Sequence, residues 1–155
     1  MEDPELHPHK NKVHHVLAHS YAVYFAALLL GMVMDLIFKF RIFQHTWWSN
    51  AGVALLFLGT ALIVWAQYTS GKLSKDEITI KTFSHGPYRY TRTPTNFGLL
   101  LIVFGFGMMI NSFFIVFFTF ISFFIAKFVF LNKEEKILAE KYGAPYLEYK
   151  KKVKF

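Results

Sequence analysis

The sequence contains no cysteine and few acidic residues. Without cysteine, its 155 residues cannot form disulfide bonds, thiolate metal sites or a cysteine nucleophile. Acids are outnumbered by bases, 10 Asp and Glu against 17 Lys and Arg, which gives a net charge of +7. A glycine-rich dinucleotide fingerprint is also missing, because Gly105-Phe106-Gly107 lies inside an apolar run with no strand before it. This glycine pair predicts a helix-packing site instead.

Hydrophobic residues are abundant and are gathered into blocks. They make up 54% of the chain, more than the roughly 45–50% of an ordinary soluble domain. A membrane-spanning helix needs about 20 mostly apolar residues. The chain offers four apolar blocks, at residues 16–38, 51–68, 97–110 and 113–131, of which the third is short for a full span. We therefore expect an all-α polytopic membrane protein with about four transmembrane helices and a cytoplasmic C-terminal helical cap.

The blocks divide one expected domain, residues 1–155, into five segments. These are a polar tail (1–15), two spans (16–68), a loop (69–96), a helical hairpin (97–131) and the C-terminal cap (132–155). Within the second block, Gly52 and Gly59 lie on one helix face and predict close helix packing.

The basic residues lie mostly on one side of this arrangement. Four spans place both termini and the 69–96 loop together, and the opposite side carries only Lys39 and Arg41. The positive-inside rule then predicts that the termini and the loop are cytoplasmic. The expected partner of this charge is the anionic membrane surface and not nucleic acid. The bases on the cytoplasmic side are Lys10, Lys12, Lys72, Lys75, Lys81, Arg89, Arg92 and seven C-terminal lysines.

The C-terminal segment has the pattern of two short helices. Apolar residues recur at helical spacing up to Tyr142, and Gly143 followed by Pro145 predicts the end of that helix. A second helix is predicted from Tyr146 to Lys152. We expect its tyrosines to face the bilayer and its lysines to face lipid phosphates.

Two polar features interrupt the apolar pattern. The stretch SHGPYRYTRTPTNFG, from Ser84 to Gly98, is stiffened by two prolines and carries Tyr88, Arg89, Tyr90 and Arg92. Taken alone, it suits a loop that re-enters at the lipid surface. The pair Glu134-Glu135, taken alone, suits a solvated first helical turn.

Together the two features resemble a known family, the membrane-embedded methyltransferases that include isoprenylcysteine carboxyl methyltransferase and the phospholipid N-methyltransferases. The sequence signature of this family begins with a strand-like stretch followed by G-[PV]-Y-x-[YW]-x-R-H-P-x-Y-x-G. A helical hairpin, a double Glu and F-G-x-x-Y-x-x-Y-x-x-x-V come after it in that order. This chain reads ITIKTFSHGPYRYTRTPTNFG, a hairpin, NKEEKIL and KYGAPYLEYKKKV. The resemblance covers Ile78 to Val153, about half of the chain.

The resemblance implies S-adenosylmethionine as cofactor, bound without a Rossmann domain. Aromatic faces and a carboxylate would stabilise its sulfonium cation. His85, beside the turn, is the histidine expected nearest to the chemistry. The implied cofactor-binding residues are Ile80, Lys81, Thr82, Phe83, His85, Tyr88, Thr93, Pro94, Thr95, Asn96 and Glu134.

Three positions depart from the family pattern. Thr93 replaces the usual His, Asn96 the usual Tyr, and Phe130 the substrate-binding Arg of the carboxyl methyltransferases. The loss of that Arg argues against a prenylcysteine carboxylate as substrate. The replacements also leave open a non-catalytic protein that retains the fold.

The implied function is methyl transfer to a lipophilic or membrane-resident acceptor, which could be an amine, a carboxylate or a thiol. Arg92 is expected to orient the acceptor or an anionic headgroup, and Tyr88, His85 or Glu135 to accept a proton from an amine. A membrane reductase using NADPH is the alternative, because TRTPTNFG partly resembles the R-x-P-N-Y-x-G element of sterol reductases. No metal site is expected, since the histidines at 7, 9, 14, 15 and 19 suit a solvated tail.

Overall fold

The computed structural model describes residues 7–41, 47–71 and 84–153, and these form helices joined by short turns. The helices are α1 (His7–Phe38), α2 (Trp47–Gly71), the 3₁₀ turn η1 (Gly86–Arg89), α4 (Pro94–Met109), α5 (Phe113–Ile125), the π-helical turn η2 (Ala126–Phe130), α6 (Leu131–Tyr142) and α7 (Ala144–Lys152). The expectation of an all-α membrane protein is confirmed.

Three helices are long and apolar enough to cross a membrane: Ala18–Phe38, Trp47–Ser70 and Phe113–Glu140, the last being continuous through α5, η2 and α6. Helix α4 is shorter, with 16 residues. At about 1.5 Å per residue it covers about 24 Å of a hydrocarbon core about 30 Å thick. The bundle therefore has three full spans and one short apolar helix.

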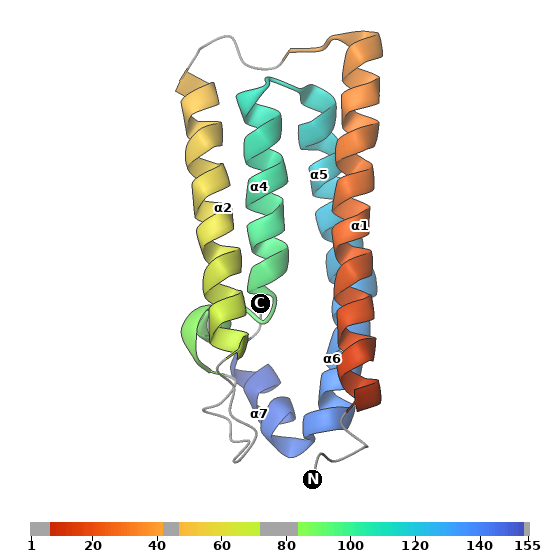
Figure 1. Cartoon of the computed structure of the whole chain (residues 1–155), viewed down its shortest axis with the longest axis vertical. Helices are drawn as coiled ribbons and strands as arrows, with labels where there is room; N and C mark the ends of the chain where they lie inside the picture. The colour runs from red at the N-terminus through yellow and green to blue at the C-terminus, as the bar shows by residue number, and fades with distance from the viewer. Residues whose placement is uncertain (1–6, 42–46, 72–83, 154–155) are drawn as a thin grey trace.

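The four apolar helices run side by side, α2 beside α4 and α1 beside α5, with α6, α7 and η1 gathered at one end (Figure 1). We call this end the site end. Helix α1 begins there and α7 lies there, so the first and last described helices share it (Figure 1). That the site end faces the cytoplasm remains a prediction from the distribution of basic residues.

Glycines allow the helices of the bundle to touch through their backbones. A Cβ atom built on Gly105 would lie 2.6 Å from the Gly52 carbonyl oxygen, and one built on Gly59 would lie 2.6 Å from that of Gly98. Gly31 makes the same kind of contact between α1 and Ile115 of α5. The prediction that Gly52 and Gly59 mark a packing face is confirmed, as is the packing role of Gly105.

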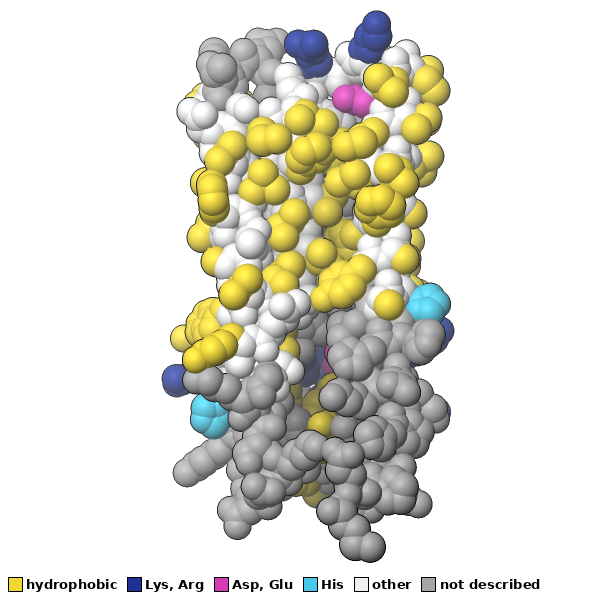
Figure 2. Space-filling view, in the orientation of Figure 1, with side chains coloured by type: hydrophobic (Ala, Val, Ile, Leu, Met, Phe, Trp, Pro, Cys, Tyr) yellow, Lys and Arg dark blue, Asp and Glu magenta, His cyan; other side chains and the backbone are white. Residues whose placement is uncertain are grey.

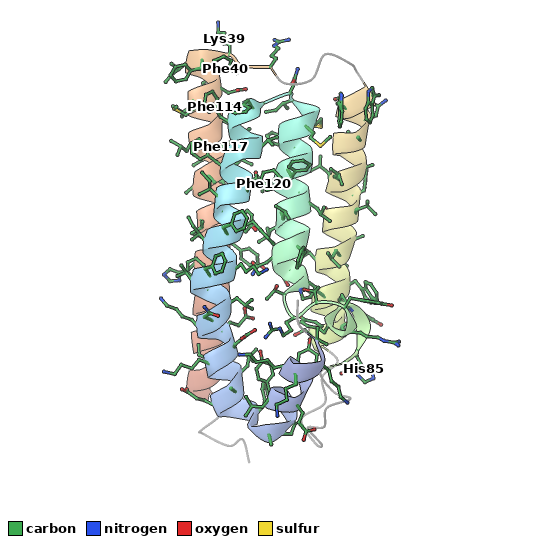
Figure 3. All side chains as sticks on the ribbon, turned by 180° about the vertical axis from the view of Figure 1, so that it is seen from behind. Lys39, Phe40, His85, Phe114, Phe117 and Phe120 are labelled. Carbon is green, nitrogen blue, oxygen red and sulfur yellow. The ribbon has the colours of Figure 1, made fainter. Side chains whose placement is uncertain are left out.

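The outer surface of the spans is hydrophobic, as Figure 2 shows for one face. Large apolar side chains are exposed along α5, among them Phe117 and Phe120, which Figure 3 labels. Ser112 begins this helix, because its side chain accepts a hydrogen bond from the Ile115 amide at 3.2 Å. Exposed phenylalanines in these numbers are expected only where lipid replaces water.

The first and last described helices add detail to the sequence-based expectation. Helix α1 begins at His7, nine residues before the first apolar block. Gly143 ends α6 as predicted, with φ of +61°, and α7 follows it. However, Tyr146 and Tyr149 of α7 are buried, each 3% exposed, so the prediction that they face the bilayer is wrong.

Candidate functional site

A tight turn directs Tyr88 toward the bundle. Gly86 has φ of +57° and packs against Thr69 of α2, where a Cβ atom would collide with the threonine side chain. Pro87 is buried, and its carbonyl accepts hydrogen bonds from the Tyr90 amide at 3.1 Å and the Thr91 amide at 3.2 Å. The stiff stretch seen in the sequence is thus a 3₁₀ turn fixed to the end of α2.

Tyr88 is held from several directions. Its carbonyl oxygen accepts a hydrogen bond from the Tyr149 hydroxyl at 2.7 Å, and its own hydroxyl group is hydrogen-bonded to Ser70 and Thr95. Burial raises the pKa of Tyr88, and the nearby Glu134 carboxylate raises it further. Tyr88 is therefore a neutral phenol at physiological pH, and Glu134 lies within electrostatic range of it.

Asn96 is fixed at the start of α4. Pro94 occupies the first turn of the helix, where its missing amide proton costs nothing. Asn96 is 7% exposed, and its side-chain oxygen accepts a hydrogen bond from the Ser20 hydroxyl of α1 at 2.8 Å. This contact joins residues 76 positions apart in the chain and ties α1 to α4 beside the site.

The two neighbouring acids of α6 have opposite surroundings. Glu135 is 6% exposed and forms ion pairs with Arg92 and with Lys150, the latter at 2.6 Å. Glu134 is half-buried, and among the described residues it has no ion pair or hydrogen bond. A partly desolvated carboxylate without a cation is costly, and a cationic ligand would remove that cost.

A cavity of about 30 Å³ opens beside Arg92, between the start of α4 and the junction of α5 with α6. Its apolar lining comes from Phe97, Phe123 and Leu131, and the other lining residues are Arg92, Thr93, Asn96 and Lys127. A second space, an apolar groove of about 550 Å³, lies between α1 and α4. Tyr21 and Tyr24 are among the residues that line this groove.

The structure brings together most of the residues predicted for the site. Thr95 and Glu134 lie near Tyr88 at the site end, whereas Arg92, Thr93 and Asn96 line the cavity there. Pro94 begins α4 directly after Thr93, and Glu135 is paired with Arg92. His85 is not part of this group, because it is exposed and lies on the outer side of η1 (Figure 3). The predicted contacts of Ile80, Lys81, Thr82 and Phe83 lie outside the described residues.

Several residues of the site gave no signal in the sequence. Ser20, Tyr21, Lys150 and Tyr149 reach it from α1 and α7, and Tyr21 is close enough to contribute to the raised pKa of Tyr88. All four lie far along the chain from the 84–98 stretch, so only the tertiary fold reveals them. The tyrosine spacing in the tail was the one hint, and it had been assigned to lipid contact.

Comparison with known families gives one match. The model of a family described as phospholipid methyltransferase matches residues 47–145, nearly two thirds of the chain. No curated protein and no solved structure shows significant similarity to this chain. The matched range includes α2, η1, the α4–α5 hairpin and both acids of α6.

Proposed function

Because the chain belongs to the phospholipid methyltransferase family, we propose that the region between Tyr88 and Glu134 binds S-adenosylmethionine and that the methyl acceptor is the amine of a membrane lipid. Members of this family are S-adenosylmethionine-dependent methyltransferases that act on lipids. The assignment of the site residues and of the amine rests on the chemistry of this chain. The family match gives no support to the reductase alternative.

The proposal depends on the Glu134 carboxylate, which has no ion pair or hydrogen bond among the described residues. S-Adenosylmethionine supplies an electrophilic methyl group on a cationic sulfur. Within residues 7–41, 47–71 and 84–153 the half-buried Glu134 carboxylate has no ion pair, which suits it to that sulfur, whereas Glu135 beside it is already paired with two basic residues. The donor set therefore fits the cofactor, with one acid acting on the ligand and the other holding the protein together.

Aromatic and polar groups complete the fit. The ring of Tyr88 offers a face for the sulfonium, and Tyr21 is close by. Thr95 and Asn96 offer hydrogen bonds for the cofactor's polar ends, and Asn96 is kept in place by Ser20. These groups are held by the fold before any ligand binds, which lowers the entropic cost of positioning.

An ammonium acceptor must lose a proton before its nitrogen can react. Tyr88 is poorly suited to accept that proton because its pKa is raised, and Glu135 because it is neutralised by Arg92 and Lys150. His85 is exposed on the outer side of the turn. Glu134 would lose the charge that stabilises the cationic sulfur if it took this proton. We therefore assign Glu134 the contact with the sulfur alone and expect the acceptor to react as the neutral amine, having given its proton to water.

The experiment is transfer of a labelled methyl group into phosphatidylethanolamine held in nanodiscs with the protein. Glu134→Gln keeps the size of the side chain and removes its charge, so we expect the rate to fall about a hundredfold. Glu140→Gln, at an exposed position on the same helix, is the matched control and should retain the wild-type rate.

If the wild-type protein and Glu134→Gln transfer the labelled methyl group at the same rate, Glu134 is not part of the site. Calorimetry separates the other two readings: heat with S-adenosylmethionine and none with NADPH is expected. A binding heat with NADPH alone would favour the reductase alternative. No binding heat with either compound would indicate a protein that retains the fold without the activity.

A further inference from the structure

The lining of the cavity beside Arg92 combines hydrogen-bond donors with apolar groups. Arg92 and Lys127 bring two positive charges to it, and no acidic side chain is among its lining residues. Thr93 and Asn96 add polar groups, while Phe97 and Phe123 continue toward the lipid-facing helices α4 and α5. Such a lining selects an anion attached to an apolar molecule.

The donors are positioned by the fold. Arg92 is held by its ion pair with Glu135, which also binds Lys150, and its side chain lines the cavity. Asn96 is buried, and its side-chain oxygen is occupied by Ser20. Asn96 also lines the cavity, and its side-chain amide carries two N–H donors.

A π-helical turn directs Lys127. In η2 the Leu131 amide donates to the Ala126 carbonyl, one residue further back than in an α-helix. The extra residue widens the helix at the height of the cavity that Lys127 lines. Wide turns of this kind recur at functional sites, and this one brings a positively charged side chain to the cavity.

We infer that this cavity binds the phosphate of the acceptor phospholipid, with Arg92 and Lys127 donating to its oxygens. The inference rests on the proposed function, since it names the part of the acceptor that the site recognises. A cavity of about 30 Å³ has room for about two water molecules, and thus for phosphate oxygens and not for a whole headgroup. Phe97 and Phe123 then contact the adjoining glycerol and acyl groups.

The test is calorimetric titration of the detergent-solubilised protein in the absence of S-adenosylmethionine. The probes are short-chain phosphatidylethanolamine, an alkylamine of the same chain length without phosphate, and inorganic phosphate. Lys127→Gln should weaken phosphatidylethanolamine binding about tenfold, because a charged hydrogen bond is lost, and leave alkylamine binding unchanged. Lys127→Arg should restore the affinity.

Lys133→Gln, at an exposed position of α6, is the matched control and should bind like the wild type. Equal weakening of both amphiphiles by Lys127→Gln, or no weakening of either, would overturn the inference. Inorganic phosphate that binds as tightly as phosphatidylethanolamine would overturn it too, because the cavity would then be a site for the free ion. Binding measured without cofactor is independent of methyl transfer, so failure of the proposed function would show in the transfer assay alone.

Discussion

The α2–α4 interface and the site end are built in different ways. Within the membrane, α2 and α4 meet backbone to backbone at Gly52 with Gly105 and at Gly59 with Gly98. At the site end, a few hydrogen bonds and ion pairs join α1, η1, α6 and α7 around space that the protein itself does not fill. The first region holds the bundle together by shape, and the second is organised for a ligand.

The largest effect is expected from filling the glycine contact. In Gly105→Leu, the new side chain would meet the Gly52 carbonyl oxygen and the Leu55 Cβ atom, and neither can move without shifting α2. We expect a loss of about 3 kcal/mol in the free energy of unfolding, measured by thermal denaturation in detergent.

The control for this variant is Leu99→Phe, on the side of α4 that lines the apolar groove. Because the groove has room, we expect a cost below about 1 kcal/mol. Equal destabilisation by the two variants would mean that the α2–α4 contact has no special role.

A smaller effect is expected at the buried acid. Glu135→Gln leaves Arg92 and Lys150 without their shared carboxylate. Removing one member of a buried pair is costly, but Lys150 is partly solvated, so we expect about 2 kcal/mol. The readout is thermal unfolding together with limited proteolysis, in which α7 should become more susceptible.

Glu148→Gln, at an exposed position of α7, should leave both readouts unchanged. Wild-type stability of Glu135→Gln would show that the ion pairs do not organise the site end.

The smallest effect is expected from Tyr149→Phe, which removes one hydroxyl group and its 2.7 Å hydrogen bond to the Tyr88 carbonyl. The free energy of unfolding should fall by about 1 kcal/mol. Affinity for S-adenosylmethionine should weaken a few-fold, because the turn that carries Tyr88 loses a support. If the stability falls as expected but the affinity for S-adenosylmethionine does not change, the Tyr149–Tyr88 hydrogen bond does not contribute to cofactor binding.

The contrast between the two regions also explains what the sequence could predict. Apolar blocks, the glycine spacing at Gly52 and Gly59, and the helix end at Gly143 are local signals, and the structure confirms each of them. The Ser20–Asn96 contact joins residues 76 positions apart, and no local pattern announces it. For the same reason the direction of Tyr149 was predicted wrongly.

The acid pair illustrates the limit most clearly. In the sequence, Glu134 and Glu135 are neighbours of the same residue type, and only the family resemblance assigns Glu134 and not Glu135 to the cofactor. Adjacent helical positions point about 100° apart, so one side chain turns to Arg92 and Lys150 and the other to Tyr88. The positions of η1 and α7 in the folded protein determine which of the two acids pairs with basic side chains.

The most direct test compares the affinities of S-adenosylmethionine and S-adenosylhomocysteine, which differ in one methyl group and in the positive charge on sulfur. If the Glu134 carboxylate faces that sulfur, Glu134→Gln will weaken S-adenosylmethionine binding about tenfold more than S-adenosylhomocysteine binding in calorimetric titration. Equal affinity changes for the two compounds would contradict the account, since the carboxylate would then not distinguish a charged sulfur from a neutral one.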